Sequence, residues 1–473
     1  MVTVPAPFFT SAYKNVDGVE LTDKSYLLTN CYADELGYTV KRPCLASFLD
    51  LQLGVNRIVS GLYWWQKNGV AYAVSGQQIF KIEYSTTASK TDMTGTGIPE
   101  INTPVTFATD GTNLYAANGG KIFYTDNSAA TIYMADGDAP IAVTHVAYLD
   151  GYLLANSVGT NRIYRSNVNA PTVWTAGDYF SAAGNSDNIT AFTVLNRDIY
   201  IFGECSTEIW QNDGTTPFSR VTGGYMDVGC IAPYSVVTSD NNIFWLSNNR
   251  RFVSIEQGGV ARISTPYDKE IESYSSVSDC RGYRVEIKGR PFLIFTFLSA
   301  GKTLVYDIDK KEWAEWNRYN STNQTNEAWL GYSYAYSPLW GKHLVGTRHD
   351  SLITELSSST YRDVGETVRT QRVTGHIDYG TLRNKRCNQL RIRMKRGSEN
   401  LTDTPQLMLR WKNNGSNNWS QEVWVDLGDQ AETDIVRKLD RLGVYATRQY
   451  EITVTDNCPL VYGGVEEDLD LLR

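Results

Sequence analysis

Hydrophobic and polar residues alternate in short runs along most of the chain, and turn residues separate the runs. In TNLYAANGGKIFYTD at 112–126 and RDIYIFGECSTEIWQND at 197–213, two apolar runs flank a short break with Gly or small polar residues. Each segment also ends in a polar stretch that contains Asp or Asn. Short alternating runs bounded by turn residues are typical of half-buried antiparallel strands. We therefore predict a β-hairpin in each segment.

The same hairpin pattern recurs at a nearly constant spacing. Further copies begin at residues 69, 151, 241, 292 and 342, so that successive starts lie 43, 39, 46, 44, 51 and 50 residues apart. Another apolar alternation precedes most copies, and the intervening residues leave room for a fourth strand. Four antiparallel strands in every ~40–50 residues is the period of a β-propeller blade. A propeller of six or seven blades is therefore predicted for 52–362, with its core formed by stacking of blades around a ring.

The pattern changes at both ends of the chain. No clear hairpin unit occurs in 1–51, which we expect to form an arm that packs against the ring or completes it. After residue 362, the segments PQLMLRWKNNG, SQEVWVDLG and RQYEITVTD alternate as the strands of a small sandwich do. The predicted fold class is all-β: a β-propeller of six or seven four-stranded blades and a smaller C-terminal β-sandwich-like domain at 363–473. A tandem of sandwiches is the alternative, and the regular spacing argues against it.

Composition agrees with a globular protein rich in strands. The 473 residues are 42% hydrophobic and 20% charged and include 30 Tyr and 12 Trp, and aromatic richness favours strands. Apolar runs such as 291–298 are far shorter than the ~20 residues of a membrane span, and the first residues lack the features of a signal peptide. The seven cysteines show no CxxC spacing, so neither a disulfide framework nor a zinc site is predicted. We expect folding in a reducing cytoplasm.

Motifs of catalysis and cofactor binding are missing from the sequence. The four histidines, at 145, 343, 349 and 376, match no metal-ligand motif, and neither a nucleophile elbow nor a phosphate-binding loop occurs. Acidic residues cluster in YDIDKKEWAEWN at 306–317 and MADGDAP at 134–140. Turn formation explains these clusters more simply than glycoside hydrolysis or calcium binding. We therefore expect no enzyme activity, no cofactor and no required metal.

A change of charge marks the C-terminal domain. Residues 362–396 hold ten Lys or Arg against three acids, whereas 463–473 is acidic. Alternation in LRIRMKR predicts that Arg391, Arg393 and Lys395 share one strand face. This face could contact nucleic acid or pair with acids at a subunit interface, and the net charge of −8 favours the interface. The predicted interface residues are Arg383, Lys385, Arg386, Arg391, Arg393, Lys395, Arg396, Glu466, Glu467 and Asp468.

Three segments resemble a known family, the packaged-DNA stabilisation or tail nozzle proteins of short-tailed bacteriophages (podophages). GYTVKRPCLASF at 37–48 is similar to an early segment of that family, with Cys44 where the family has Gly. IYIFGECSTEIWQNDGTTPF at 199–218, followed by Gly-Cys-Ile-Ala at 229–232, is similar to its central strand pair. The segment 440–468 is similar to its closing strands. In layout the resemblance covers most of the chain, and in specific residues only these patches.

The resemblance implies a structural protein of the virion tail that is assembled in the host cytoplasm. Such proteins form a ring, usually of six copies, below the portal and adaptor rings. They extend the DNA channel, retain the packaged genome and support tail fibres or spikes. The implied partners are further copies of the chain, an adaptor protein, a fibre, spike or needle protein, and passing double-stranded DNA without sequence-specific binding or membrane insertion.

Net negative charge is compatible with a channel wall that does not bind DNA. Two other functions remain open at this point. One is a carbohydrate-binding or glycoside-cleaving propeller, and the other is a general interaction scaffold.

Overall fold

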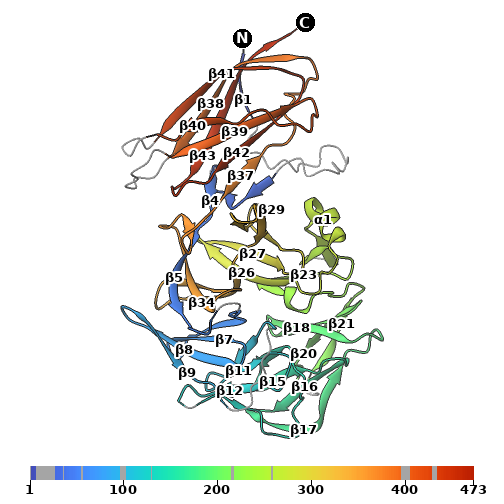
Figure 1. Ribbon diagram of the computed structural model, residues 1–473. Coiled ribbons are helices and arrows are strands. Elements are labelled where there is room, and N and C mark those ends of the chain that lie inside the picture. The colour runs from blue at the N-terminus through green and yellow to red at the C-terminus, as the bar shows by residue number, and fades with distance from the viewer. Residues whose placement is uncertain are drawn as a thin grey trace.

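Four-stranded antiparallel sheets follow one another along the chain in the computed structural model (Figure 1). Six such sheets are separate, and a seventh is formed by the first four strands of a nine-stranded sheet. The structure describes residues 2–6, 27–35, 37–54, 57–95, 103–128, 130–214, 218–256, 259–395, 405–428 and 434–472. The seven sheets are the blades of a β-propeller, which decides between the six and seven blades that the sequence allowed.

The first four blades are continuous in sequence. Blade one contains β6 (Gly61–Trp65), β7 (Val70–Ser75), β8 (Gln78–Tyr84) and β9 (Ala88–Asp92). Blade two contains β10 (Thr106–Thr109), β11 (Leu114–Ala117), β12 (Phe123–Thr125) and β13 (Ile132–Tyr133). Blade three contains β14 (Val146–Leu149), β15 (Tyr152–Asn156), β16 (Arg162–Asn167) and β17 (Ala170–Ser181). Blade four contains β18 (Ile189–Leu195), β19 (Asp198–Gly203), β20 (Thr207–Gln211) and β21 (Ser219–Met226).

The last three blades carry the short helices and an extra hairpin. Blade five contains β22 (Val237–Ser239), β23 (Asn242–Leu246), β24 (Phe252–Glu256) and β25 (Gly259–Arg262), with η1 (Pro233–Ser235) before it and η2 (Thr265–Tyr267) and α1 (Asp268–Ser273) after it. Blade six contains β26 (Arg281–Ile287), β27 (Arg290–Phe297), β28 (Lys302–Asp307) and β29 (Glu312–Glu315), and the hairpin of β30 (Asn317–Asn320) and β31 (Thr325–Ala328) follows. Blade seven contains β32 (Gly331–Ser337), β33 (Lys342–Thr347), β34 (Leu352–Ser357) and the early strand β5 (Cys44–Asp50).

The seven hairpins predicted from the repeats are confirmed as the second and third strands of the seven blades. The first strands lie side by side around the propeller axis, and β32 contacts β6, so that the ring is closed. Apolar clusters fill the spaces between blades. Trp65, Val105 and Phe123 belong to the cluster between blades one and two, while Phe202 packs on Trp245 between blades four and five at a centroid distance of 5.1 Å. The core is therefore distributed around a ring, as stacked blades require.

The C-terminal strands form a sandwich of two sheets. One sheet has the order β3 (Cys31–Ala33), β4 (Thr39–Lys41), β43 (Val461–Leu471), β38 (Lys385–Lys395) and β41 (Ile435–Tyr445), and β1 (Val2–Pro5) also pairs with β43. The other sheet contains β37 (Thr370–Val373), β42 (Arg448–Val454), β39 (Gln406–Asn413) and β40 (Val423–Asp426). Leu390 and Val465 from the first sheet pack against Leu409 and Ile452 from the second.

The propeller and the sandwich share one sheet. Strand β2 (Leu27–Thr29) lies parallel to β29 of blade six and antiparallel to β37 of the sandwich, so the nine strands form an unbroken order. The small hairpin of β35 (Arg362–Asp363) and β36 (Glu366–Thr367) lies between the last blade and β37 in sequence. Within the segment 1–51, β5 pairs with β34 of blade seven, β1, β3 and β4 belong to the first sheet of the sandwich, and β2 lies between β29 and β37.

Candidate functional site

The basic and acidic strands expected to meet between subunits lie side by side within one chain. Strand β38 pairs with β43 on one side and β41 on the other, and the register places Arg391 opposite Glu466. The guanidinium of Arg391 donates hydrogen bonds of 3.2 and 2.5 Å to the two carboxylate oxygens of Asp468, and it lies 3.8 Å from the carboxylate of Glu466. Much of the opposite charge is therefore neutralised inside the sheet.

Three of the predicted interface residues, Lys385, Glu467 and Asp468, are buried, which removes them from the surface that the folded chain presents. Lys385 is 2% exposed, and its ammonium donates to the backbone oxygens of Thr381 and Arg383 at 2.6 and 2.9 Å. Glu467 is 0% exposed and accepts a 2.5 Å hydrogen bond from the Tyr445 hydroxyl. A register shift between Cys387 and Gln389 reverses the alternation along β38, because a β-bulge inserts one extra residue.

Beyond this bulge the predicted face is present. Arg393 and Lys395 are exposed, and core side chains alternate with them. Arg393 donates to both carboxylate oxygens of Asp434 at 3.0 and 2.6 Å. Arg383 and Arg386 are also exposed, whereas Arg396 lies outside the described residues. The exposed basic residues that remain are few and dispersed along the strand.

A buried arginine ties the sandwich to the propeller. The side chain of Arg42 is fully buried, and its two terminal nitrogens donate to the two oxygens of Asp363 at 3.1 and 2.5 Å. Its Nε donates to Asn30 Oδ1 at 2.9 Å, and its guanidinium lies 5.4 Å from the ring centroids of both Trp316 and Trp329. The Arg-Pro segment that carries the early resemblance is therefore a structural joint, since Arg42 connects strands from three parts of the sequence.

The second segment that carries the family resemblance also connects two parts of the fold. Residue Cys230 donates its backbone N–H to Gly203 O at 2.9 Å, and a Cβ on Gly229 would meet the carbonyl oxygen of Glu204 at 2.3 Å. Only glycine permits such a close approach of two backbones. The segments 199–218 and 229–232 thus fix blade five against blade four.

Side chains close much of the propeller axis. A recess of about 270 Å³ lies among the first strands of blades two to six. On one side His145 stacks on Tyr234 at a centroid distance of 5.4 Å, and its Nε2 lies 3.2 Å from the carbonyl oxygen of Pro233. Burial lowers the pKa of His145 to about 4. Arg281 donates to the Ser60 carbonyl at 2.7 Å.

The volume of this recess, about 270 Å³, is too small for a DNA duplex. Even the major groove of a duplex is about 12 Å wide, and the whole duplex is wider still. His145 joins blade three to the start of blade five, and Arg281 joins blade six to the start of blade one. A single propeller therefore does not enclose a DNA channel.

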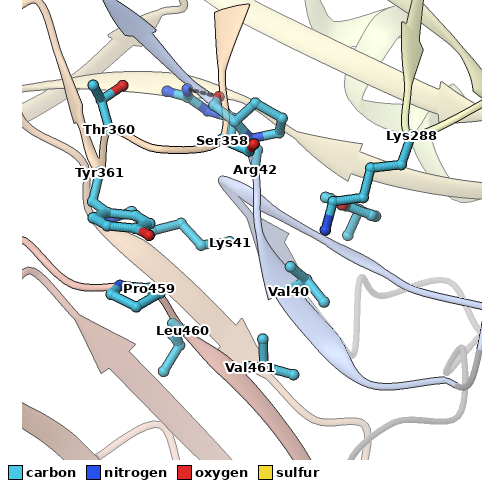
Figure 2. A pocket seen from close by; sticks show the side chains of 12 residues that line it. Val40, Lys41, Arg42, Lys288, Ser358, Thr360, Tyr361, Pro459, Leu460 and Val461 are labelled. Atoms are coloured by element: carbon cyan, nitrogen blue, oxygen red, sulfur yellow. Dashed lines mark hydrogen bonds between the residues drawn. The ribbon is translucent and has the colours of Figure 1, made fainter. Parts of the chain in front are cut away.

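A second pocket lies at the junction of the propeller and the sandwich (Figure 2). It measures about 240 Å³ and is lined by Tyr32, Val40, Lys41, Arg42, Pro43, Lys288, Ser358, Thr360, Tyr361, Pro459, Leu460 and Val461. None of these lining side chains is a carboxylate. The pocket is thus cationic and partly apolar.

The acidic clusters considered for catalysis or calcium binding stabilise turns and ion pairs. Asp307 accepts a hydrogen bond from Arg290 and two of 3.1 Å from the backbone N–H groups of Asp309 and Lys310, while burial raises its pKa. The carboxylate of Asp136 accepts two backbone N–H groups at 2.9 Å. Within the described ranges, no group of three or more His, Cys, Asp or Glu is placed to hold a metal ion.

Cysteines and helices add little chemistry to this description. All seven cysteines are free, and Cys205 alone among them is exposed. In the part of the chain that the structure describes, no helix has both the length and the apolar character needed to cross a membrane.

Comparison with known proteins identifies the family. The sequence profile of the family described as "Bacteriophage P22 Gp10, beta-propeller" matches residues 31–361, more than half of the chain. The chain belongs to this family. Members of the P22 Gp10 family are phage DNA-stabilisation proteins of the tail, so the chain is a structural β-propeller of a phage virion. No curated protein matches it in sequence.

Solved structures with similar folds are distant. The extracellular domain of the putative one-component system BT4673 from B. thetaiotaomicron is 10% identical, with a TM-score of 0.45, and the match covers 91% of this chain and 62% of that one. The N-terminal domain of Nup159 is 10% identical at a TM-score of 0.41, over 70% and 98% of the two chains. YCF48 bound to D1 peptide is 10% identical at a TM-score of 0.41, and the match covers 67% of this chain and 98% of that one. The chain thus spans less than two thirds of BT4673, and similarities at these TM-scores carry no argument about function.

Proposed function

We propose that this P22 Gp10 family member is a tail nozzle: a closed ring, of six copies, below the portal and adaptor rings of a short-tailed phage. The ring extends the DNA channel, retains the packaged genome and supports tail fibres, spikes or a needle. Assembly takes place in the host cytoplasm, before the ring becomes part of the virion. Membership in a phage DNA-stabilisation family supports this proposal.

The small recess among the first strands of the blades is the single structural observation that carries the proposal furthest. Because this recess measures only about 270 Å³, DNA would pass outside each propeller in the proposed ring. A channel wide enough for a duplex then has to be enclosed by several copies, and a closed ring is the simplest arrangement. A net charge of −8 suits a wall along which DNA slides without binding.

Contacts between copies fall outside the propeller body in this proposal. The propeller gives the ring its mass, while the C-terminal domain, 363–473, and the part of 1–51 that lies outside blade seven carry the contacts. A ring needs two different patches on each copy. We assign one patch to the exposed basic residues on and next to β38, which are Arg383, Arg386, Arg393 and Lys395. Glu466 is the exposed acidic residue beside this strand.

Electron microscopy of the purified protein and of its complex with the adaptor ring tests the proposal. We expect six-fold rings with an open centre between the propellers. The variant with Arg386, Arg393 and Lys395 changed to Glu should assemble less, whereas the same charge change at Lys67, Lys269 and Lys311, exposed on the propeller, should leave assembly intact. A stable monomer that never associates with itself or the adaptor would exclude the nozzle.

A further inference from the structure

Five segments of the chain, one of them Tyr32 of β3, build the junction pocket of Figure 2. Strand β4 and the residues after it supply Val40 to Pro43, the tip of the β26–β27 hairpin supplies Lys288, and the residues after β34 supply Ser358 to Tyr361. The beginning of β43 supplies its remaining wall, 459–461. Both the propeller and the sandwich thus contribute, so an occupant would contact the two units at once.

Lys41 gives the pocket an uncompensated positive charge. Its side chain is 7% exposed, and its ammonium reaches one backbone oxygen, that of Asp456, at 3.4 Å. The same ammonium lies 5.9 Å from the centroid of the Tyr361 ring, beside which Figure 2 shows it. An ammonium has three donors, so its hydrogen-bonding capacity is mostly unused, and desolvation lowers its pKa.

No described carboxylate neutralises this charge. The nearby pair of Arg42 and Asp363 is already matched, because both terminal nitrogens of Arg42 donate to Asp363. Lys288 is exposed at the rim, and neither lysine forms an ion pair with the residues that the structure describes. A buried charge without a partner destabilises a fold, so its presence is explained if an anion completes the site.

A further donor lies in the same pocket. The hydroxyl of Thr360 is buried and has no hydrogen-bond partner among the described residues, although buried hydroxyls are usually bonded. Val40, Leu460 and Val461 add apolar walls. The pocket therefore combines one buried cation, one unused hydroxyl and a lining that suits methylene groups.

We propose that the junction pocket binds one carboxylate on a short apolar stem, of the kind that a glutamate side chain of a partner protein presents. Its oxygens pair with the Lys41 ammonium and the Thr360 hydroxyl, and its stem contacts the apolar walls. Lys288 attracts the anion from the rim. The site stands independently of ring formation, since each copy contains the whole pocket.

The pocket chemistry favours a carboxylate over a phosphate. Phosphate recognition commonly uses an arginine fork or clustered backbone N–H groups, and the one arginine here is bound to Asp363. A single buried ammonium matches a monoanion in charge. Duplex DNA is too broad to bring its backbone into a 240 Å³ pocket whose lysine is 7% exposed.

Ligand-observed NMR with butyrate, which reproduces a glutamate side chain, tests the proposal on the purified full-length chain. Saturation transfer from protein to butyrate should be clear at millimolar ligand and absent for butyramide, its neutral isostere. Lys41→Met should weaken butyrate binding at least tenfold, and Thr360→Val should weaken it by a smaller factor. Lys310→Met, at an exposed site on blade six, should leave binding unchanged.

Three outcomes would contradict the proposed carboxylate site. They are no saturation transfer to butyrate, equal butyrate binding in Lys41→Met, and displacement of butyrate by lower concentrations of inorganic phosphate or of a duplex oligonucleotide. Lys41→Met should fold, because methionine has a similar length and the change removes a buried charge. If it does not fold, Thr360→Val, which is isosteric, decides the question in its place.

Discussion

Two arginine–aspartate pairs of similar geometry differ strongly in burial. Arg42 and Asp363 are joined by hydrogen bonds of 3.1 and 2.5 Å with side chains 0% and 3% exposed. Arg393 and Asp434 are joined by bonds of 3.0 and 2.6 Å with side chains 53% and 42% exposed. Replacing either aspartate with asparagine removes one negative charge and almost no volume. The comparison therefore isolates the effect of burial on stability.

Asp363→Asn leaves a buried guanidinium without its counter-ion, and removal of one partner from a buried pair typically costs about 3–5 kcal/mol. Asp434→Asn removes an exposed pair, for which about 0–1 kcal/mol is expected. Arg42 keeps its hydrogen bonds to Asn30 and to the backbone. We therefore expect the destabilisation by Asp363→Asn to lie near the lower end of its range, at about 3 kcal/mol. Changing Arg42 to Met together with Asp363→Leu should restore part of the loss, because both buried charges then disappear.

Chemical unfolding followed by tryptophan fluorescence measures the difference. Trp316 and Trp329 flank Arg42, so their signal reports on the junction. Because a chain of this size can unfold in several steps, only the transition that these tryptophans report should be compared. Equal shifts for Asp363→Asn and Asp434→Asn would refute the view that burial gives the junction pair its importance.

Three further predictions concern other parts of the chain. Burial lowers the pKa of His145 to about 4, so the unfolded chain binds a proton more readily than the folded chain does. The free energy of unfolding should therefore fall as pH drops from about 6.5 towards 4, by at most about 3 kcal/mol. His145→Gln should remove this part of the pH dependence of the melting temperature. Arg391→Glu should destabilise the sandwich in the full-length chain by about 1–3 kcal/mol, since it sets a carboxylate against Asp468 and Glu466. Lys395→Glu should leave the melting temperature within about 1 °C. EDTA should leave the melting temperature nearly unchanged, and a chromogenic glycoside should not be cleaved; a large decrease on chelation would reveal a structural ion.

Local patterns along the chain were sufficient to predict the blades. Each second and third strand, such as β19 and β20, is joined by a short turn, so alternation and turn residues lie within one stretch of sequence. Between the first and second strands of blades three and five, paired positive φ angles show tight turns at Asp150–Gly151 and Asp240–Asn241. These are the residue types that accept such angles readily.

Long-range pairing was not predictable in the same way. The partner of β5 is β34, where Leu49 lies opposite Ile353, and no local pattern identifies that pairing. The register of β38 depends on a bulge at Cys387, which altered the expected exposure of Lys385. The role of Arg42 depends on Asp363, and their proximity follows only from the tertiary fold, in which Val364 donates its backbone N–H to Leu45 O at 2.7 Å.

The closing strand of blade seven sets the time at which the ring can form. The backbone N–H of Leu53, just after β5, donates to the hydroxyl of Ser351, 298 residues later in the chain. At a translation rate of about 5–20 residues per second, β5 leaves the ribosome roughly 15–60 s before its partner is made. Throughout that interval its edge is unpaired and open to other chains. A chain truncated before residue 352 would contain six complete blades and an incomplete seventh, because β34, the partner of β5, would be missing.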